Sequence, residues 1–210
     1  AFSRFIDWLS GQHEDGSGVA ERIRYVVIAG DVVDGVGIYP DQENDLEETN
    51  IMKQYDLFAE YISRIPKHIK VFVSPGNHDA VRQALPQFAI SKEYAPKLYE
   101  MDNVIMLGDP AVVRLHGVNV LIYHGQSLID ILSSSPGLSF DRPAEAMKIL
   151  LQARHLAPIY GRRTSLAPET EDRLVISEVP DIFHTGHIHT LDSTVYRNIR
   201  LINSGTWQSQ

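Results

Sequence analysis

Four short groups of polar residues combine carboxylates, an amide and imidazoles, and each group directly follows an apolar run. The groups are Gly30-Asp31-Val32-Val33-Asp34, Gly76-Asn77-His78-Asp79, His124-Gly125 and Gly186-His187-Ile188-His189. Carboxylate, amide and imidazole side chains bind divalent metal ions, and imidazoles and carboxylates also transfer protons near neutral pH. The residue types therefore predict a site for metal-dependent or acid–base chemistry.

Each group also has an ordinary structural explanation. Pro75-Gly76-Asn77 fits a plain turn because all three residue types favour turns, and a single histidine at a strand end is more often structural. Asp31 and Asp34 cannot both lie unpaired in a core, so they are either exposed or bind a cation. His187 and His189 point to the same side of an extended segment. Four such groups at four strand ends favour one shared site.

The elements that carry these groups follow from hydrophobic periodicity. Buried strands are expected at residues 24–29, 69–73, 118–123 and 182–185, with further strands at 104–107 and 112–115 and a hairpin of 191–196 with 199–202. Helices are expected at residues 1–12, 48–65, 93–101, 127–132 and 143–151, with a polar loop at 13–18. Strands that alternate with helices predict an α/β protein, and the length of 210 residues predicts one domain over residues 1–210.

Composition narrows the chemistry. The chain is 43% hydrophobic, as an ordinary globular protein is, and it contains no cysteine. Disulfides, zinc–thiolate sites and cysteine nucleophiles are therefore excluded. The net charge of −8 argues against a simple duplex-binding surface, which is normally basic, although bound divalent cations would add positive charge. No apolar run approaches the roughly 20 residues that a membrane span requires.

The order of the four groups resembles the motif order of the calcineurin-like metallophosphoesterase superfamily: D-x-H, G-D-x-x-D, G-N-H-D/E, a single His and G-H-x-H. Within that superfamily the chain most resembles the small subunits of archaeal D-family DNA polymerases, which are 3′→5′ exonuclease subunits. The wider matches are residues 30–40, 74–83, 154–161, 178–182 and 203–208. These matches cover nearly the whole chain. The D-x-H motif is absent. The resemblance implies that it lies upstream of Ala1 and that this segment is trimmed at both ends; without such trimming one metal ion would lack two ligands, and the case for an enzyme would weaken.

The resemblance implies a calcineurin-like four-layer α/β/β/α fold, with two packed mixed sheets flanked by helices. It implies a two-metal 3′→5′ exodeoxyribonuclease that proofreads for an archaeal replicative DNA polymerase. The implied partners are a large catalytic polymerase subunit, in a heterodimer or larger assembly, and single-stranded or mismatched DNA 3′ ends. A cytoplasmic, nucleoid-associated location, without a membrane, follows from that function.

The resemblance also assigns metal ligands. Asp31 would bridge two divalent ions, because its two oxygens can serve two cations about 3.5–4 Å apart. Asn77, His124 and His187 would hold one ion. His189 would hold the other, together with Asp31 and the two residues of the missing motif. Mixed oxygen and nitrogen ligands suit Mn²⁺ best, with Mg²⁺, Fe²⁺ or Zn²⁺ as alternatives.

His78 is the implied general acid, which would protonate or stabilise the leaving 3′-oxygen. Asp79 would orient His78. Asp34 would support the metal ligands, with direct metal binding as its alternative role. For both aspartates the structural alternative is a turn-forming role. Four further histidines lie outside the motifs and are expected to be structural: His68, His116, His155 and His184.

Residues 154–163 form the one locally basic and aromatic segment of the sequence. Candidate DNA contacts are Arg82, Arg162 and Arg163 for phosphates, and Tyr160 and Trp207 for base stacking. A surface or packing role is an equal alternative for each of these residues.

Two other functions fit the same residues. A phosphomonoesterase or cyclic-nucleotide phosphodiesterase would use the same metal site. A non-catalytic scaffold subunit of a polymerase would share the fold, but a scaffold has no need for six metal-site residues to be present together: Asp31, Asn77, His78, His124, His187 and His189.

Overall fold

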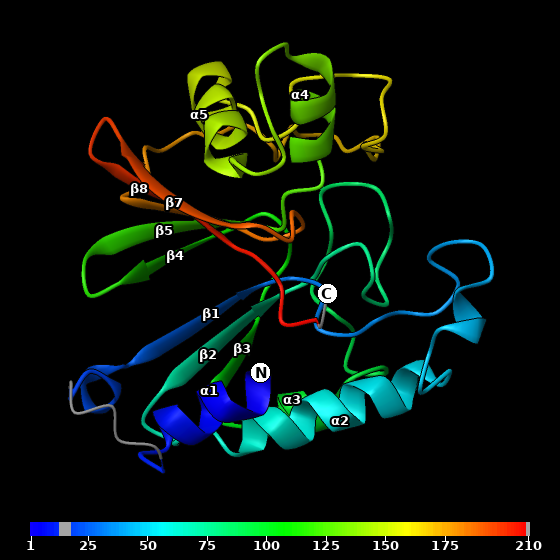
Figure 1. The fold of residues 1–210 in the computed structure, drawn as a ribbon, viewed down its shortest axis with the longest axis vertical. Helices are drawn as coiled ribbons and strands as arrows, with labels where there is room; N and C mark the ends of the chain where they lie inside the picture. Colours follow the sequence, from blue (N-terminus) through cyan, green and yellow to red (C-terminus); the bar gives the residue numbers. More distant parts are fainter. Residues whose placement is uncertain (13–17, 209–210) are drawn as a thin grey trace.

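The computed structural model describes residues 1–12 and 18–208, so most of the polar loop expected at 13–18 lies outside the described residues. Two sheets face each other, and helices lie on their outer sides (Figure 1). The smaller sheet has the order β1-β2-β3, from β1 (Tyr25–Ala29), β2 (Lys70–Ser74) and β3 (Val104–Met106). The larger sheet has the order β4-β5-β6-β8-β7, from β4 (Ala111–Leu115), β5 (Val118–Tyr123), β6 (Ile182–Thr185), β7 (Leu191–Tyr196) and β8 (Ile199–Ser204).

The helices complete the four layers. Beside the smaller sheet lie α1 (Phe2–Leu9), α2 (Ile51–Ser63) and α3 (Pro96–Tyr99), and beside the larger sheet lie α4 (Leu128–Ser134) and α5 (Pro143–Ala153). Two short 3₁₀ helices, Ala20–Arg22 and Gln42–Asn44, lie in the connections. The α/β/β/α arrangement expected from the sequence is confirmed.

Apolar side chains fill the space between neighbouring layers. Between the two sheets, Ala29 of β1 packs with Val120 and Ile122 of β5. Tyr55 and Ile62 of α2 belong to a second cluster that joins the helices to the smaller sheet. A third cluster joins α4 and α5 to the larger sheet. These layers hold the two sheets in a fixed relation, which a site built from both of them requires.

The smaller sheet is parallel throughout its described strands, whereas two mixed sheets were expected. The chain returns from β1 to β2 through α2, and such a crossover connection makes the two strands parallel. The larger sheet is mixed: β5, β6 and β8 run parallel, and β4 and β7 are antiparallel to their neighbours.

Parallel pairing brings the polar groups to one edge. Ala29 at the end of β1 pairs with Ser74 of β2, and Tyr123 at the end of β5 pairs with Thr185 of β6. The groups after these four strands therefore leave the sheets side by side, where ligands of α/β proteins commonly bind. The expected placement at strand ends is confirmed.

Three helices are shorter than expected: α1 spans Phe2–Leu9 rather than residues 1–12, and the other two are shortened for local reasons. The side chain of Asn50 accepts hydrogen bonds from the backbone N–H groups of Met52 and Lys53, so α2 begins at Ile51 rather than at residue 48. The helix expected at 93–101 is only the four residues of α3, because Pro96 restricts the residue before it to non-helical backbone. No helix among the described residues is both long and apolar enough to cross a membrane.

His184 lies in β6, where it is 8% exposed and pairs across the sheet with Ile122 and Ile202. Burial lowers the pKa of His184 from 6.5 to about 4. Between pH 6.5 and about 4, His184 is therefore protonated in the unfolded chain but mostly neutral in the folded chain. The neutral, buried His184 therefore contributes to the free energy of unfolding above pH 6.5, and this contribution is lost as the pH falls from 6.5 through about 4.

We expect His184→Met to remove this loss, since methionine has a similar length and does not titrate. Between neutral pH and pH 4, the unsubstituted protein should lose roughly 3 kcal/mol more of its unfolding free energy than the variant loses. Urea unfolding at both pH values measures the difference. If the unfolding free energies of the two proteins respond equally to pH, folding does not lower the pKa of His184.

Candidate metal centre

His124 is held at both its backbone and its ring. Its side chain is fully buried, and its Nδ1 lies 2.7 Å from the carbonyl oxygen of Ala29. A carbonyl only accepts, so Nδ1 carries the hydrogen and Nε2 is left to face the other ligands. The backbone N–H of His124 donates to Oδ1 of Asp109 at 2.7 Å. The direction of Nε2 is therefore fixed by the end of β1 and by Asp109.

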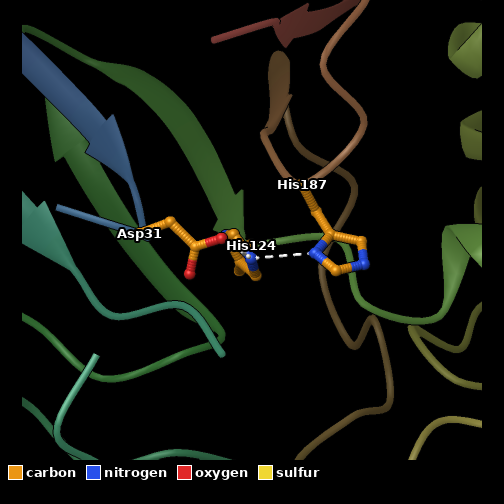
Figure 2. Close-up of side chains that lie close together, drawn as sticks. All are labelled: Asp31, His124 and His187. Carbon is orange, nitrogen blue, oxygen red and sulfur yellow. Dashed lines mark hydrogen bonds and ion pairs between the residues drawn. The ribbon is translucent and has the colours of Figure 1, made fainter. Parts of the chain in front are cut away.

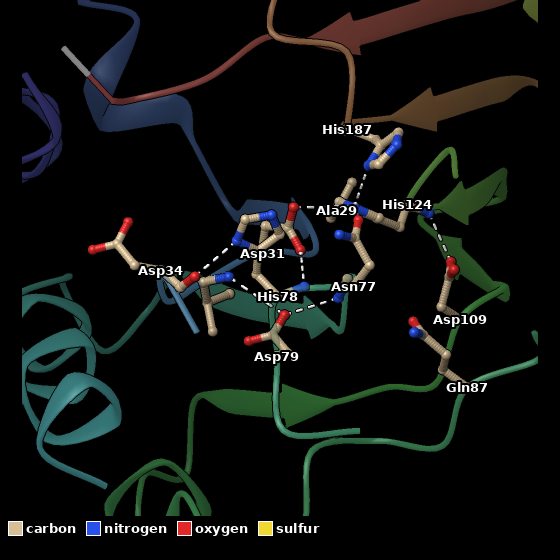
Figure 3. A network of polar contacts seen from close by, with 12 residues as sticks. Ala29, Asp31, Asp34, Asn77, His78, Asp79, Gln87, Asp109, His124 and His187 are labelled. Atoms are coloured by element: carbon tan, nitrogen blue, oxygen red, sulfur yellow. Dashed lines mark hydrogen bonds and ion pairs between the residues drawn. The ribbon is translucent and has the colours of Figure 1, made fainter. Parts of the chain in front are cut away.

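Three other ligand atoms surround this nitrogen (Figures 2 and 3). Nε2 of His124 lies 3.2 Å from Oδ2 of Asp31, 3.0 Å from Oδ1 of Asn77 and 3.1 Å from Nδ1 of His187. The ligand atoms of Asp31, His124 and His187 all lie within 4.8 Å of one another. Converging lone pairs repel one another unless a proton or a metal ion lies among them.

The donor set fits a divalent metal ion. One carboxylate, one amide oxygen and two imidazole nitrogens are the ligand types of Mn²⁺, Fe²⁺ and Zn²⁺ sites. The hydrogen bond from Nδ1 of His124 to Ala29 is the support that a metal-binding histidine requires on its second nitrogen. The structure thus brings together four of the five ligands predicted from the sequence.

The electrostatics favour a positive charge at this point. Burial opposes ionisation of both Asp31 and His124, but their mutual attraction outweighs it. The pKa of Asp31 is therefore held below its ordinary value and the pKa of His124 above its ordinary value. Burial, then the nearby His124, lowers the pKa of His187 to about 3, so His187 is neutral and able to bind a cation.

The backbone at two of these residues adopts a conformation that non-glycine residues rarely take. Asp31 has φ 53° and His187 has φ 62°, both in the left-handed region. Such strain persists where the surroundings over-determine it, and it concentrates at functional sites. Gly30 also allows close packing, because a Cβ there would lie 2.6 Å from the carbonyl oxygen of Pro75.

His78 lies beside the cluster and lines a cavity of about 640 Å³ that also reaches Asp31, His187 and His189. Its backbone N–H donates to Oδ1 of Asp31 at 2.8 Å, and its Nδ1 lies 2.7 Å from the carbonyl oxygen of Asp34. Nδ1 is therefore the donor, and Nε2 is the ring nitrogen left for chemistry.

Asp79 does not orient His78 as the sequence led us to expect. One carboxylate oxygen of Asp79 accepts from the N–H of Gly76 at 2.8 Å, and the other accepts from the hydroxyl of Tyr55 at 3.1 Å. Burial, then the charge of Asp31, raises the pKa of Asp79 to about 7. Asp79 is buried and therefore fixes the turn at Gly76 and the hydroxyl of Tyr55 rather than the ring of His78.

Asp34 supports the site through its backbone rather than through its carboxylate. Its carbonyl oxygen accepts from the ring of His78, while its exposed carboxylate accepts from Nε2 of Gln208 at 3.1 Å. His189 is exposed on the cavity wall and is not part of the four-ligand cluster. Its predicted role at a second ion stays a prediction.

The predicted DNA contacts divide into two groups. Arg82 forms an ion pair with Glu169, and Trp207 packs on Phe2 and Phe5 with ring centroids 5.6 and 5.4 Å away. These contacts fit the packing or surface role that was the alternative for each residue, and their DNA contacts stay predictions. Tyr160, by contrast, is 89% exposed, and it lies in the same exposed loop as Arg162 and Arg163.

Sequence reasoning missed several residues that hold the site. Asp109 is buried and fixes the backbone of His124, and Gln87 pairs with it through two backbone hydrogen bonds. Gln42 and Gln54 are buried below the loop of Asp34. Gly108-Asp109-Pro110 has the composition of a plain turn, Gln42 lies among acidic residues, and Gln54 lies within the helix expected at 48–65, so composition offers no signal for these residues.

Two facing sheets with a carboxylate, an amide and histidines gathered at their strand ends define a calcineurin-like phosphoesterase fold. The sequence family of the B subunits of DNA polymerases alpha and epsilon matches residues 2–193, and the chain belongs to this family. The resemblance inferred from the sequence is confirmed.

The relatives are archaeal. The chain is 48% identical over 212 residues to the DNA polymerase II small subunit of Pyrococcus furiosus, with 100% of this chain and 35% of that protein covered. It is 52% identical over 208 residues to the DNA polymerase II small subunit of Archaeoglobus fulgidus, with 98% and 42% covered. The chain therefore spans less than half the length of these curated relatives. A crystal structure of Vps29 complexed with zinc from Entamoeba histolytica matches with a TM-score of 0.41 at 15% identity, over 97% of this chain and 64% of that chain.

We expect His187→Ala to weaken Mn²⁺ binding at least about tenfold, since it removes one of four converging ligands. Calorimetric titration of the metal-free protein with MnCl₂ measures this. His68→Ala is the matched control, because His68 is exposed and lies outside the cluster. Equal affinity of the two variants for Mn²⁺ would exclude His187 as a ligand.

Proposed function

We propose that this chain is the catalytic part of a two-metal 3′→5′ exodeoxyribonuclease in the small subunit of an archaeal replicative DNA polymerase. The observation that carries the proposal is the convergence of four ligand atoms on one point, with His78 beside them on the cavity wall. A scaffold subunit needs neither feature, and four ligand atoms held face to face require a cation or a proton between them.

The proposed chemistry is hydrolysis of the phosphodiester bond at a DNA 3′ end. When bound, two divalent ions, best matched by Mn²⁺, would supply a hydroxide nucleophile and stabilise charge on the phosphoryl oxygens. Asp31, Asn77, His124 and His187 would hold one ion, and Asp31 with His189 would contribute to the other.

His78 would act as the general acid from Nε2. The acid form is the imidazolium: its Nδ1–H stays hydrogen-bonded to the carbonyl oxygen of Asp34, and its second proton, on Nε2, faces the cavity and leaves the neutral Nδ1–H ring behind when it is transferred. Transfer of that proton to the departing 3′-oxygen would prevent an alkoxide from forming. Because Asp34 holds Nδ1, the proton on Nε2 is delivered at one defined position.

The relatives are named as polymerase small subunits, which supports a large polymerase subunit as partner and a location at the nucleoid in the cytoplasm. A proofreading subunit must receive 3′ ends that have separated from the template. Single-stranded or mismatched 3′ ends are therefore the proposed substrates.

The loop of residues 160–163 is the proposed contact for the strand. The buried Asp130 of α4 accepts hydrogen bonds from the backbone N–H groups of Arg163 and Thr164, each at 3.0 Å. These two hydrogen bonds fix the end of the loop, at Arg163 and Thr164, against α4, the helix that follows His124. Tyr160 is left exposed for stacking on a base, and Arg162 and Arg163 are left exposed for phosphates.

We expect His78→Ala to lower the rate of 3′ nucleotide release by about 100-fold or more while leaving Mn²⁺ affinity unchanged, because an acid is lost and no ligand is lost. The measurement uses the protein at its full natural length, with its polymerase partner, on single-stranded DNA that ends in a 3′ mismatch. His68→Ala should keep the full rate.

The same preparations distinguish the alternative functions. Hydrolysis of p-nitrophenyl phosphate or cyclic nucleotides in preference to DNA would identify a phosphomonoesterase or cyclic phosphodiesterase. Mn²⁺ binding without hydrolysis of any of these substrates would support the scaffold. A His78→Ala variant that degrades DNA at the full rate would exclude His78 as the acid.

We expect Tyr160→Ala to weaken binding of single-stranded DNA by roughly five- to 100-fold, which corresponds to the loss of one stacked base. Fluorescence anisotropy with a labelled oligonucleotide measures the affinity. Val179→Ala is the control, since Val179 is also highly exposed, at 76%, but precedes β6 at the opposite end of the sheet from the metal centre. Equal affinities would place the DNA elsewhere.

A further inference from the structure

The carbonyl oxygen of Asp34 accepts two side-chain hydrogen bonds at once. Nδ1 of His78 lies 2.7 Å from it, and Nε2 of Gln42 lies 2.9 Å from it. A carbonyl oxygen has two lone pairs, so these two donors use its full capacity. The peptide that orients His78 is thus itself held in place by Gln42.

Gln42 is almost completely buried, at 1% exposed, at the start of a 3₁₀ helix. Its Oε1 accepts from the backbone N–H of Ile38 at 2.8 Å. The side chain therefore ties Ile38 to Asp34 and closes the loop between them. Burying an amide side chain is unfavourable unless its polar atoms are paired, and here both are paired.

A second glutamine holds the next residue of the same loop. Oε1 of Gln54 accepts from the N–H of Gly35 at 3.0 Å, and its Nε2 donates to the carbonyl oxygens of Gly35 at 3.2 Å and of Glu48 at 2.7 Å. Gln54 lies on α2 and is 8% exposed. The loop is thereby anchored to a regular helix.

Gly35 also contacts the His78 backbone directly. A Cβ at Gly35 would lie 2.5 Å from the carbonyl oxygen of His78, and its φ of +78° disfavours any other residue. The loop after β1 and the loop after β2 are therefore in backbone contact at this point. A displacement of Asp34 or Gly35 cannot leave His78 unmoved.

We infer that Gln42 and Gln54, here called the glutamine brace, are positioning residues that hold the Asp34 carbonyl against Nδ1 of His78 and so present Nε2 to the cavity. The hydrogen bonds of the brace are independent of any activity. Only the consequence for catalysis rests on the proposed function, in which His78 is the general acid.

The test is the tautomer of His78, read from the ¹⁵N resonances of its ring in metal-free protein of full natural length. With the brace intact, neutral His78 should carry its hydrogen on Nδ1. Gln42→Glu keeps the size of the side chain and the acceptor for Ile38 but loses the donor to Asp34. In this variant we expect the hydrogen to redistribute toward Nε2.

Gln42→Met is the second variant, which removes both hydrogen bonds, and Gln152→Met on the outer helix α5 is the matched control. Both brace variants should lose about tenfold in kcat for 3′ nucleotide release at unchanged KM for DNA, whereas the control should match the unsubstituted protein. An Nδ1–H tautomer that persists in a folded brace variant would overturn the inference. If the tautomer shifts as expected and no preparation hydrolyses DNA, the proposed function fails and the brace stands.

Discussion

The segment from Ala29 to Asp34, at the end of β1, is the feature on which the rest of the site depends. Its carbonyl at Ala29 fixes the ring of His124, its carbonyl at Asp34 fixes the ring of His78, and the carboxylate of Asp31 lies between the two histidines. Two backbone carbonyls thereby orient the rings of both histidines. The nitrogen at the candidate metal position and the proposed acid are set by one short stretch of main chain, so neither can be displaced alone.

That stretch keeps its shape because neighbouring backbones leave it no room. Gly30 lies against Pro75, and Gly35 lies against His78, so the loops after β1 and β2 are in contact at two points. Asp31 accordingly holds a left-handed conformation that an isolated aspartate disfavours. Buried side chains secure the loops from below: Asp79 holds the N–H of Gly76, and Gln54 holds Gly35. Pre-organisation of this kind places ligands before a metal ion arrives.

Hydrophobic period and residue type were enough to predict the strand ends and the kinds of polar residue gathered there, whereas the four layers and the assignment of metal ligands came from the family resemblance. The sequence could not reveal the partner of each polar group. Asp79 stands next to His78 in the chain, yet its side chain is buried toward Tyr55, and the carbonyl of Asp34 takes the place expected for it. Backbone acceptors carry no residue identity, and buried glutamines such as Gln42 resemble solvated ones in a sequence. Such contacts depend on loop geometry, which local propensity does not determine.

The carboxylates around His124 divide into two kinds, and the division bears on how an acidic chain could carry out the proposed reaction on a polyanion. Burial raises the pKa of Asp79 and of Asp109 to about 7, whereas the pKa of Asp31 is lowered. Near neutral pH, Asp31 is thus the fully charged carboxylate at the candidate metal position, and the other ligands there are neutral once a metal ion takes the place of a proton on His124. A divalent ion held by one carboxylate and neutral ligands keeps a net positive charge. In the proposed function that charge would attract and polarise a phosphodiester, so the net charge of the whole chain does not oppose the proposed chemistry.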